Sequence, residues 1–182
     1  MFSHTTFLTR KRRSVRQYTD ERIKPEVLQD ILEAGLRAPT SKNSRSTRFI
    51  VVEDKAMLQE LSACKKHGGA FVAEAALAIV VCSDSEKSAR PYSDCAIAAS
   101  FMQLAVTDHD LGSCWCHVED TLAPTGTTAE AYVRERLGLP ERFKVLCILG
   151  IGEVAEADML KPRDRELEWE RTYVEQYEER EE

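Results

Sequence analysis

The residues best suited to binding chemistry form a basic segment near the start of the chain, Arg10-Lys11-Arg12-Arg13-Ser14-Val15-Arg16-Gln17-Tyr18. Five of its first seven residues are cations, in a protein whose formal net charge is −6 at pH 7. Neighbouring like charges repel, and a bound phosphate or carboxylate relieves that repulsion. Short Lys/Arg runs also occur as nucleic-acid-binding arms and as targeting signals, so the segment alone leaves three interpretations open.

Two further polar stretches could bind the same anion. The run from Arg37 to Ser46 is rich in turn-forming residues and gathers hydroxyls, an amide and cations, while Lys161-Pro162-Arg163 adds two more cations. The Gly-rich phosphate loops GxxxxGK and GxGxxG are both absent, so side chains would have to hold a phosphate. Arginine suits that task, because its planar guanidinium donates two hydrogen bonds to phosphate oxygens. A solvated connection remains the alternative for the run from Arg37 to Ser46.

The cysteines show one pattern that could bind a metal. Cys82 and Cys147 lie in apolar runs typical of buried strands, where a cysteine in a reducing compartment behaves as a small hydrophobe. Cys114-Trp115-Cys116-His117 offers three soft ligands. However, adjacent strand residues point to opposite faces, and no second Cys/His pair occurs at the spacing of a zinc site. We therefore expect a buried strand edge and no metal.

The histidines give no catalytic pattern. His4, His67, His109 and His117 are scattered and match no triad. His109 stands between Asp108 and Asp110, which favours a solvated helix end over a role in proton transfer. No catalytic acid or base is predicted.

Composition sets the broad class. A chain of 182 residues with 43% hydrophobic content can bury the core of one domain. The net negative charge argues against a general nucleic-acid binder, which needs a broad basic surface. Residues 1–8 lack the continuous apolar segment of a signal peptide, and no stretch is long enough to cross a bilayer. We therefore expect a cytoplasmic protein with neither a nucleic-acid nor a membrane partner.

Periodicity predicts a chain in which helices and strands alternate, typical of a mixed sheet covered by helices. The expected helices are Ile23–Gly35, Asp54–Cys64, Ser93–Val106 and Thr128–Leu137, and the expected strands are Arg48–Val52, Leu77–Cys82, Leu111–Cys116 and Lys144–Ile151. The helix Ser93–Val106 is apolar nearly all round, which indicates burial on most sides or a place in a subunit interface.

The end of the chain differs from the rest. Apolar residues become sparse after Ala155, yet Trp169, Tyr173 and Tyr177 recur every four residues. At helical spacing these aromatics form one stripe. We therefore expect a docked arm, seated on its own chain or on a partner.

Four of these stretches, in this order, are similar to the nitroreductase family of FMN-dependent oxidoreductases. They are Arg12–Tyr18, Ala38–Ser44, Asp94–Leu104 followed by Leu111–Trp115, and Lys161–Arg163. The resemblance covers nearly the whole chain. It implies an α+β fold, a mixed sheet flanked by helices, as a single domain over residues 1–182 with residues 161–182 as a C-terminal docking arm. It also implies an intertwined homodimer with two FMN molecules at the subunit interface.

The resemblance implies which residues bind the cofactor, because positions in this chain match the binding motifs of the family. It implies that the FMN phosphate and ribityl chain are held by Arg12, Arg13, Ser14, Arg16, Lys161 and Arg163. It implies that the other subunit contributes Pro39, Thr40, Ser41, Asn43 and Arg45. It places Cys114, Trp115 and Cys116 beside the isoalloxazine ring. Arg10 and Lys11 fall outside the matched motif and are expected to be ordinary surface charges.

The implied activity is a ping-pong transfer of electrons from NADH or NADPH to a small acceptor, such as a nitroaromatic or a quinone. The cofactor performs the redox step, so the protein's part is to bind and orient it. Other flavin chemistry, such as reductive dehalogenation or dehydrogenation, and a non-enzymatic flavin-binding module remain as alternatives. One departure stands out: many relatives continue after Asn43 with Gln-Pro-Trp, whereas this chain has Arg45 and Arg48 nearby. Two arginines at the flavin edge would favour an anionic substrate or stabilise reduced flavin.

Overall fold

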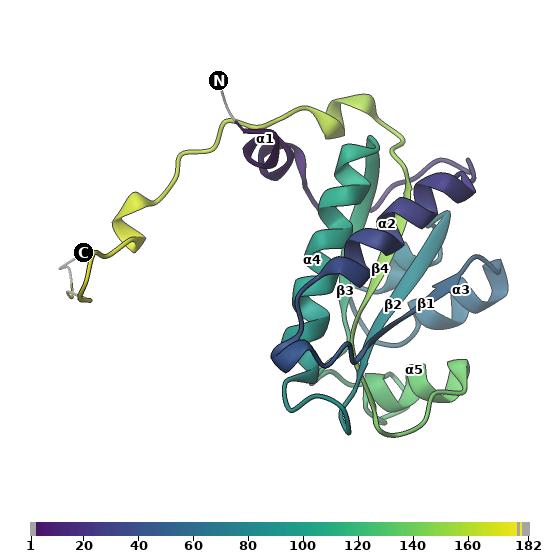
Figure 1. Ribbon diagram of the computed structural model, residues 1–182. Helices are drawn as coiled ribbons and strands as arrows, with labels where there is room; N and C mark the ends of the chain where they lie inside the picture. The colour runs from purple at the N-terminus through teal and green to yellow at the C-terminus, as the bar shows by residue number, and fades with distance from the viewer. Residues whose placement is uncertain (1–2, 178, 180–182) are drawn as a thin grey trace.

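The computed structural model describes residues 3–177 and 179, in which four strands form one sheet between two layers of helices (Figure 1). The strands are Thr47–Val52 (β1), Leu77–Asp84 (β2), Leu111–His117 (β3) and Phe143–Glu153 (β4). The α-helices are His4–Lys11 (α1), Pro25–Arg37 (α2), Lys55–Ser62 (α3), Pro91–Asp108 (α4) and Ala129–Leu137 (α5). This architecture confirms the α+β class.

The sheet has the order β1-β2-β4-β3, and all its strand pairs are antiparallel. Its parallel component is a single bridge between Ser14 and Ser113, at the edge of β3. The central strands are buried on both faces, which explains their nearly continuous apolar sequences. All eight strands and helices expected from the sequence are present, and their ends differ from the expected ones by at most two residues.

The sheet divides the hydrophobic interior into two cores. Along β2, Ile79 packs on the α2/α4 side with Met102, and Val80 packs on the α3/α5 side with Val133. Helices α2 and α4 lie close together because Gly35 has no side chain. A Cβ at Gly35 would lie 2.9 Å from the sulfur of Met102. This contact fixes α4, the longest helix of the described chain, against the sheet.

Helix α4 leaves part of its apolar surface uncovered. Its inner side, which includes Cys95 and Ala99, is fully buried. On its outer side, Ile97 and Phe101 are 38% and 42% exposed. The single chain therefore does not bury α4 on all sides, and the expected subunit interface stays a prediction.

Helix α1 was missed in the sequence analysis. Ser3 caps its start, accepting a hydrogen bond from the Thr6 backbone N–H at 3.1 Å, and Leu8 is its main buried residue. Arg10 and Lys11 occupy its last turn, where cations interact favourably with the helix dipole. The sequence does contain a signal for this helix, because the capping Ser3 is followed by Leu8 and Lys11 at helical spacing.

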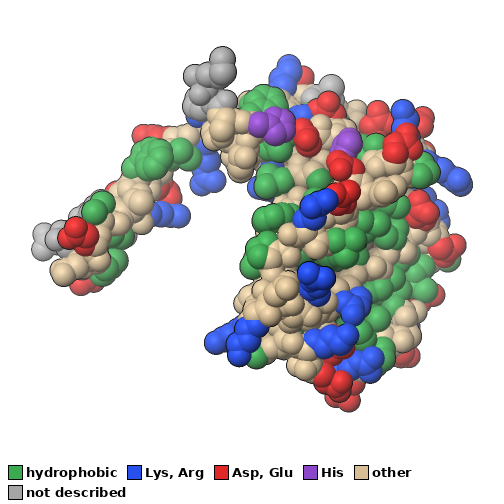
Figure 2. All heavy atoms as spheres, in the orientation of Figure 1, with side chains coloured by type: hydrophobic (Ala, Val, Ile, Leu, Met, Phe, Trp, Pro, Cys, Tyr) green, Lys and Arg blue, Asp and Glu red, His purple; other side chains and the backbone are tan. Residues whose placement is uncertain are grey.

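The prediction that the tail aromatics form a stripe on a helix is wrong. The tail contains one short 3-10 turn, Trp169–Arg171, and the rings of Tyr173 and Tyr177 meet at 4.7 Å across a non-helical turn. A short helix is marginal without packing, and here half of the side chains between the aromatics are charged. The tail extends away from the body, with Trp169 and Tyr177 each 72% exposed (Figures 1 and 2). Residues 178 and 180–182 of the expected arm lie outside the described residues, so its docking stays a prediction.

No helix in the described part of the chain combines the length and hydropathy needed to cross a bilayer.

Candidate functional site

The basic segment crosses the end of the sheet where β3 begins and β4 ends. The backbone N–H of Val15 donates to the Ser113 carbonyl at 2.9 Å, and that of Thr19 donates to the Glu153 carbonyl at 2.9 Å. The Val15 side chain is buried, so its neighbours Ser14 and Arg16 point outward and are exposed. The sheet edge thereby presents a hydroxyl and a guanidinium to solvent.

Tyr18 anchors the far end of this segment. Its hydroxyl donates to the carbonyls of Val15 at 2.6 Å and Gly150 at 3.0 Å, and burial raises its pKa. The Tyr18 side chain packs against Gly152, where an added Cβ would lie 2.8 Å from the nearest ring carbon. The segment is therefore held by its backbone, by Val15 and by Tyr18. The exposed side chain of Arg16 takes no part in these contacts and can serve a ligand.

The start of the tail lies against the same segment. A guanidinium nitrogen of Arg13 donates to the Lys161 carbonyl at 2.6 Å, and the Arg163 backbone N–H donates to the Arg10 carbonyl at 3.2 Å. Partial burial and the nearby charge of Arg163 lower the pKa of Arg13. Two cationic stretches separated by about 150 residues therefore converge, and their mutual repulsion would be relieved by an anion.

Arg10 and Lys11 do not behave alike. Arg10 makes an ion pair with Asp164 at 2.8 Å and remains near the surface. Lys11 is only 8% exposed and pairs with Asp110, just beyond the end of α4. The expectation of an ordinary surface charge is therefore wrong for Lys11, because a partly desolvated ammonium needs the carboxylate that α4 brings to it.

The second expected stretch forms a strained turn beside the start of α4. It contains the 3-10 turn Ser41–Asn43 (η1), and Lys42, Asn43 and Arg45 have φ angles of 52°, 54° and 48°. Left-handed conformations of residues other than glycine cost roughly 1–3 kcal/mol each and are frequent at functional sites. Thr40 helps to hold the turn, because its hydroxyl accepts the Arg45 backbone N–H at 3.0 Å.

Side chains of the turn face outward. Pro39, Asn43 and Arg45 are exposed, whereas Thr40 and Ser41 are half-buried. Lys and Arg side chains gather at this end of the molecule, where η1 lies (Figures 1 and 2). The turn thus offers an amide and a guanidinium to a ligand.

The two arginines singled out near the turn have different roles. Arg48 donates from one guanidinium nitrogen to the carbonyls of Arg45 at 3.0 Å and Thr47 at 2.7 Å, so it braces the backbone. Arg45 is exposed, with a long contact of 3.4 Å from its Nε to the amide oxygen of Asn43. Arg45 is therefore the better placed of the two to meet an anionic ligand.

The basic segment and the strained turn lie at opposite ends of α4. Asp94, in the first turn of α4, hydrogen-bonds to the turn at Ser41, whereas Asp108 at its end pairs with His4 of α1 at 3.2 Å. An α-helix of 18 residues is about 27 Å long. The two stretches are therefore separated along the length of α4.

The three residues expected beside the flavin ring are split between the faces of β3. Cys114 and Cys116 are 1% and 0% exposed and lie in the α3/α5 core. Burial raises the pKa of Cys114, and a hydrogen bond with Cys64 together with burial raises that of Cys116. Trp115 points to the other face, half-buried, and donates to His117 at 3.3 Å. Trp115 is the one side chain of the three that is partly exposed, and the expected position of these residues beside the flavin ring stays a prediction.

Cys114 and Cys116 are buried on β3, an edge strand of the sheet, as the sequence predicts. In the described residues, no group of three His, Cys, Asp or Glu side chains is arranged to hold a metal ion.

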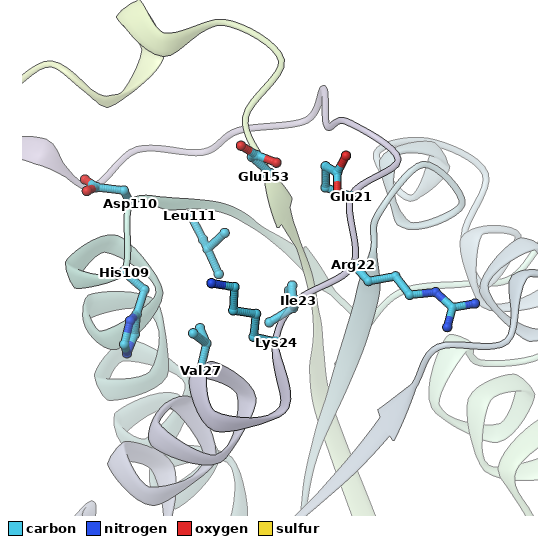
Figure 3. Close-up of a pocket in the computed structure, with 9 residues that line it drawn as sticks. All are labelled: Glu21, Arg22, Ile23, Lys24, Val27, His109, Asp110, Leu111 and Glu153. Carbon is cyan, nitrogen blue, oxygen red and sulfur yellow. The ribbon is translucent and has the colours of Figure 1, made fainter.

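A cavity of about 350 Å³ lies between the start of α2 and the end of α4, away from the expected ligand residues (Figure 3). Its lining residues are Glu21, Arg22, Ile23, Lys24, Val27, His109, Asp110, Leu111 and Glu153. His109, expected at a solvated helix end, contacts Asp30 of α2 at 2.7 Å and so links the two helices. None of the residues expected to bind FMN lines this cavity.

Comparison with known proteins gives a consistent result. The sequence profile described as the nitroreductase family matches residues 9–68 and 58–153. A protein of Archaeoglobus fulgidus, provisionally named NADH dehydrogenase/NAD(P)H nitroreductase, is 35% identical over 159 residues, which cover 85% of this chain and 88% of that protein.

Solved structures agree. An FMN-dependent nitroreductase from Clostridium difficile R20291 superimposes with a TM-score of 0.89 and 38% identity, over 94% of this chain and 99% of that one. A protein from Desulfovibrio desulfuricans, solved in complex with FMN, superimposes with a TM-score of 0.78 and 26% identity, over 98% of this chain and all of that one.

Proposed function

Because the chain belongs to the nitroreductase family, we propose that it is an FMN-dependent oxidoreductase that passes electrons from NADH or NADPH to a small acceptor. The acceptor class is nitroaromatic or quinone, and the two half-reactions follow a ping-pong order. When bound, FMN would supply the redox chemistry, which is hydride transfer from the nicotinamide and electron transfer to the acceptor. The names of the relatives support the cofactor and the donor.

The observation that carries this proposal is the convergence of the cationic stretches on an exposed hydroxyl. The side chains concerned are Arg12, Arg13, Ser14, Arg16, Lys161 and Arg163. This donor set fits a phosphate, because guanidinium and hydroxyl groups are hydrogen-bond donors and the cluster has an excess of positive charge. In the proposed site these residues bind the phosphate end of FMN and so orient the ring relative to β3.

The second half of the proposed site comes from a partner subunit. The separation along α4 supports this, and so do the exposed Ile97 and Phe101, which would lie in a homodimer interface. We propose that residues 161–182 act as an arm that docks on the partner, as the exposed Trp169 and Tyr177 would favour. In this dimer the strained turn presents Pro39–Ser41, Asn43 and Arg45 to the flavin of the other subunit.

A simple experiment tests the proposed activity. The purified protein, loaded with FMN, should be yellow, should lose its colour with NADH or NADPH, and should regain it with a quinone or a nitroaromatic. Flavin that neither nicotinamide reduces would favour other flavin chemistry or a binding module without turnover. A protein that takes up no added FMN would refute all flavin-based functions.

The exposure of Arg45 makes a prediction about the acceptor. Arg45→Ala should lower kcat/KM about tenfold for an anionic nitroaromatic and less than twofold for a neutral quinone, since one charge contact is lost. The matched control is Lys42→Ala, which removes a neighbouring exposed cation of the same turn. Equal losses for the two acceptors in the Arg45 variant would refute a role for its charge.

We also propose a reducing, cytoplasmic location. All six cysteines are free and buried, a pattern that suits a compartment where disulfides do not form.

A further inference from the structure

Asp94 is a buried carboxylate at the junction of α4 and the strained turn. It is 1% exposed, and within the described residues it makes no ion pair with a lysine, arginine or histidine. A buried carboxylate without a cationic partner is retained only where hydrogen bonds satisfy it. Its place in the first turn of α4 adds the favourable field of the helix N-terminus.

The hydrogen bonds of Asp94 come mostly from the turn. Oδ1 accepts the Ser41 backbone N–H at 2.7 Å. Oδ2 accepts the hydroxyls of Ser88 at 2.6 Å and Ser46 at 3.1 Å, with Ser44 further away at 3.4 Å. Three of the four donors therefore belong to residues 41–46, about 50 positions earlier in the chain.

These bonds enclose the strained residues. Lys42, Asn43 and Arg45, with positive φ angles, lie between Ser41 and Ser46, and both of these are bound to the same carboxylate. Among the three strained residues only asparagine adopts this conformation readily, so the surroundings must impose it on the two cations. Without the carboxylate, the turn would relax toward ordinary backbone angles and move the Asn43 and Arg45 side chains.

The carboxylate of Asp94 is also connected to the central sheet. Ser46 is buried and accepts a hydrogen bond from the hydroxyl of Ser83, a buried residue of β2, at 2.7 Å. The carboxylate is therefore connected both to α4 and to the central sheet. This arrangement gives the turn a fixed position relative to the rigid part of the protein.

We propose that Asp94 is a positioning residue, whose carboxylate holds residues 41–46 in the strained conformation that presents Asn43 and Arg45 to the ligand. It acts through the backbone and hydroxyls of the turn and touches neither cofactor nor substrate. The identity of the ligand rests on the proposed function, whereas the effect on the turn does not.

The test is Asp94→Asn in the full-length protein. The amide has nearly the same shape, and its oxygen can still accept the Ser41 N–H, but its NH₂ group cannot accept the hydroxyl protons of Ser46 and Ser88. Hydrogen exchange of the amides in residues 41–45 should become at least about tenfold faster. The FMN affinity should fall about tenfold, because the turn is no longer preorganised.

The matched control is Glu130→Gln, another carboxylate-to-amide change near the start of α4. Glu130 accepts the Val145 N–H at 2.7 Å and the Tyr92 hydroxyl at 3.0 Å, and makes no hydrogen bond to the turn. Its variant should leave exchange in residues 41–45 within about twofold of the unmodified protein. Faster exchange there of equal size in both variants would mean general destabilisation and would overturn the proposal.

A double variant separates positioning from simple stability. If Asp94 places Arg45, then Arg45→Ala should change the preference for an anionic acceptor strongly in the unmodified protein and little in the Asp94→Asn background. Additive effects would contradict the proposal. If the protein bound no FMN, the proposed function would fail, and the exchange measurement alone would decide the role of Asp94. Should Asp94→Asn not fold, Ser46→Ala removes one donor of the turn and should give a smaller increase in exchange.

Discussion

Arg16→Glu is expected to weaken FMN binding about 100-fold, which is about 2.8 kcal/mol at 1.4 kcal/mol per tenfold change. Arg16 is exposed beside the buried Val15, so the substitution leaves the packing of the segment intact. The loss has two parts: a charge-assisted hydrogen bond to the phosphate, about 1.5–3 kcal/mol, and new repulsion between two anions. Titration of the FMN-free protein with FMN, followed by flavin fluorescence, measures the change.

The same variant should not be less stable without FMN. Reversing one charge relieves the repulsion among Arg12, Arg13 and Arg163, so the thermal midpoint should stay the same or rise slightly. Arg22→Glu is the control, because it makes the same charge change on an exposed residue outside the basic segment. Retained yellow colour in the Arg16 variant, or equal loss in the control, would contradict the phosphate assignment.

Mixing two inactive variants is expected to restore FMN binding if the site is shared between subunits. One variant carries Arg16→Glu, and the other carries Asn43→Asp with Arg45→Glu in the strained turn. In a mixed dimer, one site has both defects and the other has none. With random exchange of subunits, about one quarter of all sites should bind FMN at the affinity of the unmodified protein.

Aspartate is chosen at position 43 because, like asparagine, it tolerates the left-handed backbone found there, with φ of 54°. The readout is FMN bound per protein after unfolding and refolding the two variants together, compared with each refolded alone. No gain on mixing would show that each chain holds its own cofactor. In that case the separation of the two stretches along α4 would indicate two separate ligand sites.

Much of the fold follows from short-range patterns. The strands β2 and β4 are recognisable as apolar runs because helices cover both faces of the sheet, and α4 is recognisable because few of its residues are polar. Short-range patterns do not predict secondary structure correctly where contacts with distant parts of the chain decide it. The spacing of Trp169, Tyr173 and Tyr177 suggests a helix, but Trp169 and Tyr177 remain exposed, and the described part of the tail is largely non-helical.

The sequence by itself determined the chemical character of the site. The basic segment, the polar run from Arg37 to Ser46 and the pair Lys161/Arg163 indicate an anionic ligand, because charge and hydrogen-bonding capacity belong to residue types. The resemblance added FMN and the order of the motifs. Neither required knowledge of which residues meet in space.

The tertiary structure decided how these groups are arranged. It joined the Arg10–Tyr18 segment to Lys161–Arg163, placed the Thr40–Arg45 turn at the far end of α4, and removed the thiols of Cys114 and Cys116 from the surface. It also gave Asp94 its role, which no local pattern shows, because its partners are about 50 residues away. Hydrogen bonds and burial between distant segments depend on packing, and packing is a property of the whole fold.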